Sequence, residues 1–384
     1  MDDGYRLIQE KLEEGIDFIA TASTQWHAIC VDAAIYDINI RLNHKPRGII
    51  IITRYGKDYR ISEENFKMDK YADITYVVKG QDNTSTTKRV KSFTQEYALL
   101  NSKIKLLRDV NANYMQKTLF LISPVAPDNR LLLYLNEKIV DKYSIVYLVD
   151  DGGLGAYMPK NFSNASNEAP ADASAFNLLV RKKGLDFDRK VRKSYLPYVT
   201  VEKRNLFIKD DDGSLRPSTL TESYKAVLDL RTPEIDYNME GKCILFITQP
   251  YSEFGFIDPD VELKVISSII DEVKNIGIPI LLKPHPRENP DKYKTLTDVE
   301  IIPNTFSIEE LLPSLNIAGL IGFTSSVLIN AAVFYNIRTI SLADIICQKT
   351  DNPTLLKSAG ELKKMSHKFI NFTDDLMDLY LWIH

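Results

Sequence analysis

Residues Gly48–Thr53 have the sequence GIIIIT, and this stretch decides the fold class. Four consecutive isoleucines leave no polar face, and β-branched side chains favour a strand over a helix. Pro46 and Gly56 bound the run on either side. The stretch therefore predicts a strand buried on both faces, the type found in parallel sheets that helices cover.

The chain around this strand alternates strand-like and helix-like segments. Asp17–Ala22 is a short apolar run, and Gln25–Ile38 follows Ser23-Thr24, which can cap a helix. Further strand-like runs are ADITYVV, TLFLIS and SIVYLV, with a helix-like stretch at 92–107 among them. Alternating strands and helices imply a parallel sheet with right-handed crossovers. Residues 1–160 are therefore expected to form a Rossmann-like domain of the α/β class.

The second half repeats this pattern after a break. Residues 161–239 begin rich in Asn, Ser, Ala and Pro and continue with a basic stretch, which predicts a connector or a set of insertions. From Cys243–Thr248 (CILFIT) onward, strands and helices are expected to alternate again. Residues 240–384 are expected to form a second Rossmann-like domain, with a helix at Asp374–Trp382 that crosses back over the junction. Two such domains with their parallel sheets facing an interdomain cleft form the architecture called GT-B.

Composition limits the class of protein. With 384 residues, 44% hydrophobic and 26% charged, the chain fits two soluble α/β domains. The net charge of −4 argues against a nucleic-acid partner. The sequence favours a reduced, cytoplasmic protein. Its three cysteines are single and form no CxxC pair, and it shows neither an apolar signal segment nor an apolar run of about 20 residues. Peripheral docking on the inner face of the membrane stays open.

Ligands of a parallel sheet collect at the carboxyl ends of the strands, so residues directly after strands are the candidates for chemistry. Asp150-Asp151-Gly152 follows the strand-like run SIVYLV. Two adjacent carboxylates repel each other, which can raise the pKa of one of them and suit it to act as a general base. The alternative is an ordinary Asp-Gly turn at a strand end.

Lys283-Pro284-His285-Pro286-Arg287 follows a predicted strand of the second half. Prolines on both sides hold His285 in a rigid, extended loop, and the two basic residues favour a phosphate ligand. A protonated histidine there can neutralise the charge that develops on a leaving phosphate. The alternative is a structural proline-rich turn with a surface histidine.

Thr324-Ser325-Ser326 lies where a predicted strand meets a predicted helix, and hydroxyls and N–H groups at such a junction suit an anion. Because Ser and Thr are also common helix caps, this pattern alone is not specific. No Walker A, HExxH or GxSxG sequence occurs, and Gly153-x-Gly155 lacks the third glycine of a dinucleotide fingerprint. His27 is expected to be a packed core histidine, because it falls within a predicted helix.

Taken in order, Asp150-Asp151-Gly152, His285-Pro286 and Ser325-Ser326 resemble the motif set of bacterial sialyltransferases with GT-B folds. These are glycosyltransferase families 52 (lipooligosaccharide sialyltransferases), 38 (capsular polysialyltransferases) and 80. The resemblance is carried by about Cys243–Leu342 and by the surroundings of Asp150. It implies that Asp150 deprotonates the acceptor hydroxyl, and that His285 protonates or hydrogen-bonds the departing CMP phosphate.

The resemblance also implies the rest of the donor site. Ser325 and Ser326 would bind the phosphate of CMP, and an acidic residue between the HP and Ser motifs would hold its ribose. Glu309 fits this place, with Glu310 as the close alternative. Lys283, Pro286 and Gly152 complete the donor-binding set. In family 52 the base can instead be a carboxylate of the second domain, which here would be Glu253 or Asp258.

The implied reaction is a one-step, inverting transfer from CMP-sialic acid to a galactose- or sialic acid-terminated glycan of the bacterial surface, lipooligosaccharide or capsular oligosaccharide. No metal or other cofactor is implied, although Asp210-Asp211-Asp212 formally contains a DxD sequence in a polar loop. Extension of capsular polysialic acid is one alternative. A GT-B transferase for another nucleotide, and a non-catalytic nucleotide-sugar-binding protein of a capsule locus, are the others.

Overall fold

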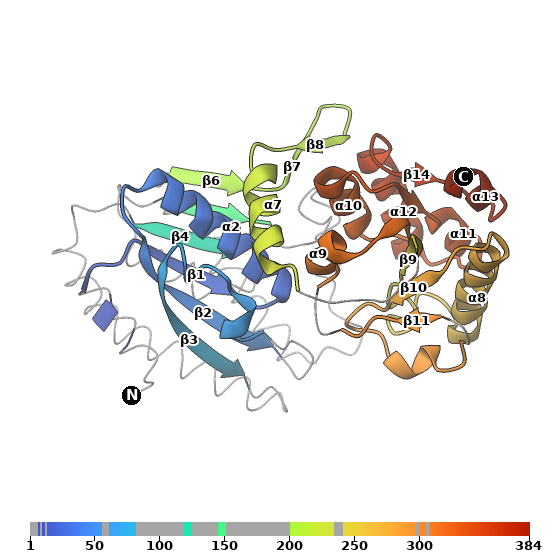
Figure 1. Cartoon of the computed structure of the whole chain (residues 1–384), viewed down its shortest axis with the longest axis horizontal. Coiled ribbons are helices and arrows are strands. Elements are labelled where there is room, and N and C mark those ends of the chain that lie inside the picture. Colours follow the sequence, from blue (N-terminus) through green and yellow to red (C-terminus); the bar gives the residue numbers. More distant parts are fainter. Residues whose placement is uncertain are drawn as a thin grey trace, which may run out of the picture. The chain divides into compact units, whose positions relative to one another are not determined.

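The computed structural model describes residues 7, 10–11, 14–55, 61–81, 119–124, 145–150, 200–233, 241–296, 299–304 and 307–384. The chain falls into two compact units (Figure 1). Unit 1 comprises Met1–Leu206 and Glu222–Val227, and unit 2 comprises Phe207–Thr221 and Leu228–His384. The helix expected at 92–107 lies outside the described residues.

Unit 1 contains a six-stranded sheet in which every neighbouring pair of strands is parallel. The strands lie in the order β3 (Asp73–Gln81), β2 (Arg47–Tyr55), β1 (Phe18–Ala22), β4 (Phe120–Pro124), β5 (Ile145–Val149) and β6 (Thr200–Arg204). Ile49–Ile52 of β2 are fully buried, as the four consecutive isoleucines predict.

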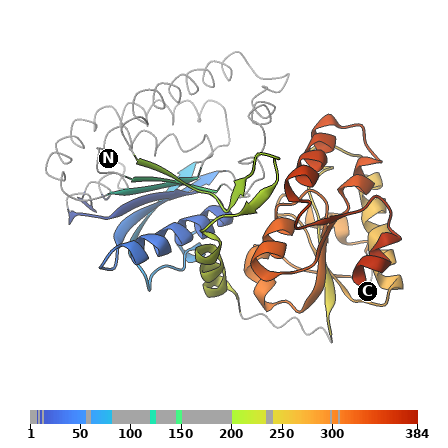
Figure 2. The same ribbon diagram turned by 90° about the horizontal axis from the view of Figure 1, so that it is seen from above.

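One face of this sheet is covered by helix α2 (Gln25–Arg41), as Figure 2 shows. The helix begins after Thr24, whose hydroxyl oxygen accepts a hydrogen bond from the His27 N–H at 3.1 Å. A short 3-10 helix, η1 (Glu63–Asn65), precedes β3. The cap expected from Ser23-Thr24 is therefore confirmed. The helix that follows ends at Arg41, three residues later than predicted.

The segment between the two parallel sheets has structure of its own. Residues 200–204, within the predicted connector 161–239, form β6 at the edge of the first sheet. β7 (Phe207–Lys209) and β8 (Leu215–Pro217) form an antiparallel hairpin in unit 2. Helix α7 (Thr221–Arg231) follows, and the division between the units runs through it.

Unit 2 repeats the strand order of unit 1. Its strands lie in the order β11 (Glu300–Ile301), β10 (Ile280–Lys283), β9 (Cys243–Ile247), β12 (Ile317–Gly322), β13 (Thr339–Ser341) and β14 (Asn371–Phe372), all parallel. This order of 3-2-1-4-5-6 is that of a Rossmann sheet, and its topological switch point lies between β9 and β12. The predicted class of two parallel-sheet, Rossmann-like α/β units is confirmed, whereas the predicted cleft between them stays a prediction.

Helices cover both faces of the second sheet (Figure 2). α8 (Pro259–Asn275) and α13 (Asp378–Ile383) lie on one face, and α9 (Ile308–Leu311) and α10 (Val327–Tyr335) lie on the other. The remaining helical elements are η4 (Pro290–Tyr293), η5 (Leu312–Ser314), α11 (Ala343–Cys347) and α12 (Pro353–Ser366). The helix expected to cross back over the junction corresponds to α13, which packs against α8 within unit 2; its crossing of the junction stays a prediction.

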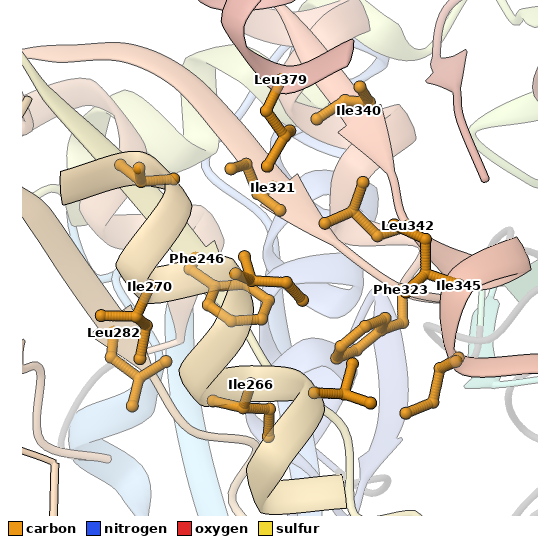
Figure 3. Packing of buried hydrophobic residues seen from close by; sticks show 14 of the residues in the cluster. Phe246, Ile266, Ile270, Leu282, Ile321, Phe323, Ile340, Leu342, Ile345 and Leu379 are labelled. Carbon is orange, nitrogen blue, oxygen red and sulfur yellow. The ribbon is translucent and has the colours of Figure 1, made fainter. Parts of the chain in front are cut away.

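The core of unit 2 lies between its sheet and α8 (Figure 3). Phe246 of β9 and Phe323, just after β12, meet edge to face with ring centroids 5.6 Å apart. Ile266 and Ile270 of α8 pack in the same cluster. None of the helices in the described part of the chain combines the length and the apolarity that crossing a bilayer requires.

Candidate functional site

The acidic motif of unit 1 lies at the carboxyl end of a parallel strand. Asp150 directly follows β5 and is 3% exposed. Asp151 and Gly152 lie outside the described residues. The structure therefore places Asp150 where the sheet presents its ligands, as predicted, and describes it within unit 1 alone.

In unit 2, the HP loop comprises residues 284–288 and directly follows β10. The Nδ1 atom of His285 accepts a hydrogen bond from the Arg287 N–H at 3.1 Å. A neutral imidazole with an accepting Nδ1 carries its proton on Nε2, so His285 is an Nε2–H donor. Burial lowers the pKa of His285, and the nearby carboxylate of Glu288 acts in the opposite direction. The ring is therefore neutral near pH 7, and it donates a hydrogen bond without needing an extra proton.

Glu288 holds the HP loop in place with its carboxylate. The side chain is fully buried and accepts four hydrogen bonds. One oxygen accepts from the Thr248 hydroxyl and the His285 N–H, each at 2.6 Å. The other oxygen accepts from the Tyr293 hydroxyl at 2.5 Å and from Lys292 Nζ at 3.1 Å. Both oxygens are fully used, so Glu288 supports the loop rather than offering a ligand atom.

Glu253, Glu262 and Glu288 bring carboxylate oxygens close enough together to hold a metal ion. The ammonium of Lys292 lies among them, at 3.3, 2.7 and 3.1 Å respectively. Burial alone would lower the pKa of Lys292, but its bonds to Glu262 and Glu288 raise it overall. The cluster is thus a buried ion-pair network whose cation is Lys292.

Lys283 and Glu309 are two ionisable side chains in a desolvated environment. Lys283 is 4% exposed, and its Nζ donates to Asn304 Oδ1. Burial lowers the pKa of Lys283 to about 8, against the opposing influence of Glu309 and Glu288. Glu309 accepts from Asn330 Nδ2 at 3.3 Å, and burial raises its pKa to about 7. Two groups with pKa values shifted toward neutrality at strand and helix ends are typical of a functional site.

Glu310, the alternative to Glu309, has a structural task. Its Oε1 accepts from Nε of the buried Arg231 at 2.8 Å. Its Oε2 accepts from the Ser307 N–H and hydroxyl, both at 3.0 Å, which makes a capping box at the start of α9. Both oxygens of Glu310 are occupied, so Glu309 is the acidic side chain of this pair that suits a ligand.

The serine motif lies at the turn between β12 and α10, beside the switch point of the sheet. Ser325 is 8% exposed and its hydroxyl oxygen accepts from the Val327 N–H at 3.3 Å, while Ser326 is half-buried. Thr324 is held by Tyr251, whose hydroxyl lies 2.6 Å from Thr324 Oγ1. The turn is therefore fixed from the end of β9, which lies next to β12 in the sheet.

Comparison with known families now decides the class. The family model described as alpha-2,8-polysialyltransferase matches residues 18–344. The chain belongs to the alpha-2,8-polysialyltransferase family. It is therefore a glycosyltransferase of the sialyltransferase class that uses a nucleotide-sugar donor and a capsular glycan acceptor, which confirms the predicted enzyme class. The match also confirms the resemblance to bacterial sialyltransferases, and it favours the polysialyltransferase alternative over the lipooligosaccharide one.

Solved structures that resemble this polysialyltransferase-family chain include two UDP-GlcNAc 2-epimerases. One is from Methanocaldococcus jannaschii, with 12% identity, TM-score 0.45, and coverage of 95% of this chain and 91% of that chain. The other is from Neisseria meningitidis, with 10% identity, TM-score 0.43, and coverage of 95% and 89%. The wall teichoic acid polymerase TagF has 12% identity, TM-score 0.44, and coverage of 99% and 83%. Likeness at this level says nothing about the reaction, and no curated protein matches.

Glu253 and Asp258, the alternative bases named from the sequence, both make contacts that hold local structure in this polysialyltransferase-family chain. Burial would raise the pKa of Glu253, but hydrogen bonds from the Asn289 N–H and Lys292 lower it overall. Asp258 caps α8 by accepting from the N–H groups of Asp260 and Val261. The carboxylates named as alternative bases are thus both engaged in holding backbone or loop structure.

Two further features of the polysialyltransferase-family chain belong to the fold. Asp212 accepts from the Ser214 N–H and hydroxyl at 2.8 and 2.6 Å, so the DxD-like triplet is the turn of the β7–β8 hairpin. His27 is 5% exposed, and its Nδ1 lies 2.9 Å from the Ser23 hydroxyl. The packed position expected for His27 is confirmed.

No role was predicted from the sequence for the residues that support the donor-side motifs. Glu288 ends the run Lys283-Pro284-His285-Pro286-Arg287-Glu288, but no task was predicted for it. Arg231, Asn330 and Lys292 come from separate elements, and nothing in their local sequence links them to the motifs. Pro286 is exposed beside His285, and no contact in the described residues gives it a role beyond shaping the loop.

Proposed function

We propose that this chain transfers sialic acid from CMP-sialic acid to the terminal sialic acid of a capsular glycan, and so extends polysialic acid. The observation that carries the proposal is the desolvated group of Lys283, His285 and Glu309 at the strand and helix ends of unit 2. It supplies a cation, a neutral N–H donor and a carboxylate within the unit that also carries Ser325-Ser326. A nucleoside monophosphate needs such groups for its phosphate and its ribose.

On the donor side, His285 donates its Nε2–H to a phosphate oxygen of CMP. As the bond between the anomeric carbon and the phosphate oxygen breaks, negative charge develops on that oxygen, and the hydrogen bond strengthens. Lys283 supplies positive charge from the end of β10, and Ser325 and Ser326 donate hydroxyl hydrogen bonds to the phosphate. Glu309, once ionised, accepts hydrogen bonds from the ribose hydroxyls.

On the acceptor side, Asp150 accepts the proton of the attacking sialic acid hydroxyl. The acceptor oxygen forms a bond to the anomeric carbon on the face opposite CMP, so the configuration inverts and CMP leaves. A positioned base of this kind contributes a rate factor of roughly 10²–10⁴. The engagement of Glu253 and Asp258 in loop and helix-cap contacts supports Asp150 over either as the base.

The test compares transfer and donor binding in Asp150→Asn. We expect CMP release with a sialic acid-terminated primer to fall by at least about 10²-fold. Stabilisation by CMP should persist, since a ligand at 100 times its Kd adds about 2.7 kcal/mol when the nucleotide site is intact. Asp258→Asn is the matched control, and its turnover should stay within a few-fold of the parent. Near-normal turnover in Asp150→Asn would show that another group is the base.

A further inference from the structure

We infer that Glu288 is a positioning residue that holds His285 as an Nε2–H donor for the donor phosphate. The inference rests on the proposed role of His285 and extends it to Glu288, a residue outside the His285-Pro286 pair to which no role in the reaction has been given. Glu288 cannot reach a ligand itself, because its side chain is fully buried and both oxygens are occupied. Its effect on the reaction must therefore pass through the loop that it supports.

The first step of the argument is the backbone of the loop. The His285 N–H donates to the Glu288 side chain at 2.6 Å, and the Glu288 N–H donates to the His285 carbonyl oxygen at 2.9 Å. These two bonds close a tight turn around Pro286-Arg287. The turn places the Arg287 N–H 3.1 Å from His285 Nδ1.

The second step is the tautomer. A backbone N–H can only donate, so the Arg287 N–H requires a lone pair on His285 Nδ1. The proton of the neutral ring is then on Nε2, the nitrogen that the turn does not use. Glu288 therefore fixes both the position of the ring and the atom that donates.

The third step is the anchoring of Glu288 itself. Thr248 extends from the end of β9, and Tyr293 and Lys292 come from η4. Their bonds to Glu288 tie the loop after β10 to two neighbouring elements. Lys292 also pairs with Glu262 and Glu288, so the donors around the Glu288 carboxylate include its counter-charge.

A double-mutant cycle tests the inference. Gln at position 288 keeps the shape but has one accepting oxygen for four donors. We expect Glu288→Gln to reduce kcat about 10-fold or more, with a smaller change in CMP affinity, because the His285 contact is strongest in the transition state. In a His285→Ala background the same substitution should change kcat less than about 2-fold, because the ring through which Glu288 acts is gone.

Glu262→Gln is the matched control, since Glu262 also pairs with Lys292, at 2.7 Å, and lies outside the HP loop; its kcat should stay near the parent value. If Glu288→Gln does not fold, Thr248→Val replaces it. This substitution removes the hydroxyl that donates to Glu288 Oε2, the oxygen that also accepts from the His285 N–H, and its loss of kcat should likewise disappear in the His285→Ala background. Equal losses of kcat in both backgrounds, or no loss in the parent, overturn the positioning role. Normal turnover in His285→Ala alone would instead overturn the proposed role of His285.

Discussion

Glu309 and Glu310 are adjacent in sequence, yet their surroundings give them opposite effects on stability. Glu310 pairs with the buried Arg231 and caps α9, so its charge is compensated. Glu309 is buried, and burial raises its pKa to about 7 against the opposing hydrogen bonds from its own N–H and from Asn330. The folded protein therefore prefers Glu309 protonated. Its stability falls as the pH rises from the pKa of this glutamate in the unfolded chain to about 7, the pKa in the folded state.

This difference predicts the result of Glu309→Gln. At pH 8 the substitution removes a carboxylate whose ionisation is penalised, and we expect stability to rise by about 1–3 kcal/mol, since one pKa unit corresponds to about 1.4 kcal/mol. The gain should vanish at pH values below the ordinary pKa of a glutamate. CMP affinity of the parent should increase as the pH rises through about 7, and this increase should be absent in the variant. Calorimetric unfolding and CMP titration across pH measure both effects.

Glu310→Gln is the matched control for that prediction. It leaves Arg231 buried without its charged partner, so we expect a loss of about 3–5 kcal/mol at the same pH. A loss of stability in both variants would contradict the assignment of Glu309 as the carboxylate whose ionisation is penalised.

At the scale of single residues, sequence could name the motif positions and put Glu309 ahead of Glu310, but it offered no physical reason for that choice. Asp150, His285, Ser325 and Ser326 follow predicted strands, and the structure places each at a strand end. The choice of Glu309 depends on Arg231, which lies 79 residues before Glu310 in the chain. No periodicity or spacing within a short window carries that information.

At the scale of elements, α13 shows how a terminal helix is held on its own unit. Trp382 is 8% exposed and packs on Gly319 of β12, where a Cβ atom would overlap the indole ring. Leu379 of the same helix is fully buried in the core. A glycine in the strand is therefore needed for close approach of the helix.

Two glycine substitutions in unit 2 should have opposite effects. Gly319→Ala forces Trp382 away from β12, and we expect a loss of about 1–3 kcal/mol. Gly360→Ala lies in the interior of α12 with open space around its Cβ position, and helix propensity predicts a gain of about 0.5–1 kcal/mol. Scanning calorimetry should show the unfolding midpoint falling in the first variant and rising in the second. A Gly319→Ala protein as stable as the parent would show that α13 does not depend on this contact.

The success of sequence prediction at this scale follows from burial. β1, β2, β9 and β12 are short apolar runs covered on both faces, and such runs stand out in sequence. β14 has two residues, Asn371 and Phe372, which is too short for any pattern. α12 was not predicted although Asn352 caps it and Pro353 begins it, a start signal that sequence reasoning could have used.

At the scale of the whole molecule, the chain repeats one sheet topology in two units and gives each a different chemistry. Unit 1 presents a carboxylate, Asp150, after β5. Unit 2 presents the donor-type groups after β10 and β12, together with the buried Lys283 at the end of β10 and the buried Glu309 in α9. A transferase needs a base for the acceptor and a cradle for the leaving nucleotide, and we propose that these two strand-end sets supply one each.

The most direct test of the central claim is the product distribution from CMP-sialic acid and a short α2,8-linked oligosialic acid primer, followed by mass spectrometry and by CMP release. We expect CMP to be released in step with a ladder of primers that grow by single sialic acid residues. Asp150→Asn should yield neither product at a comparable rate. Absence of CMP release with this primer, or release of CMP without any longer product, would contradict the account.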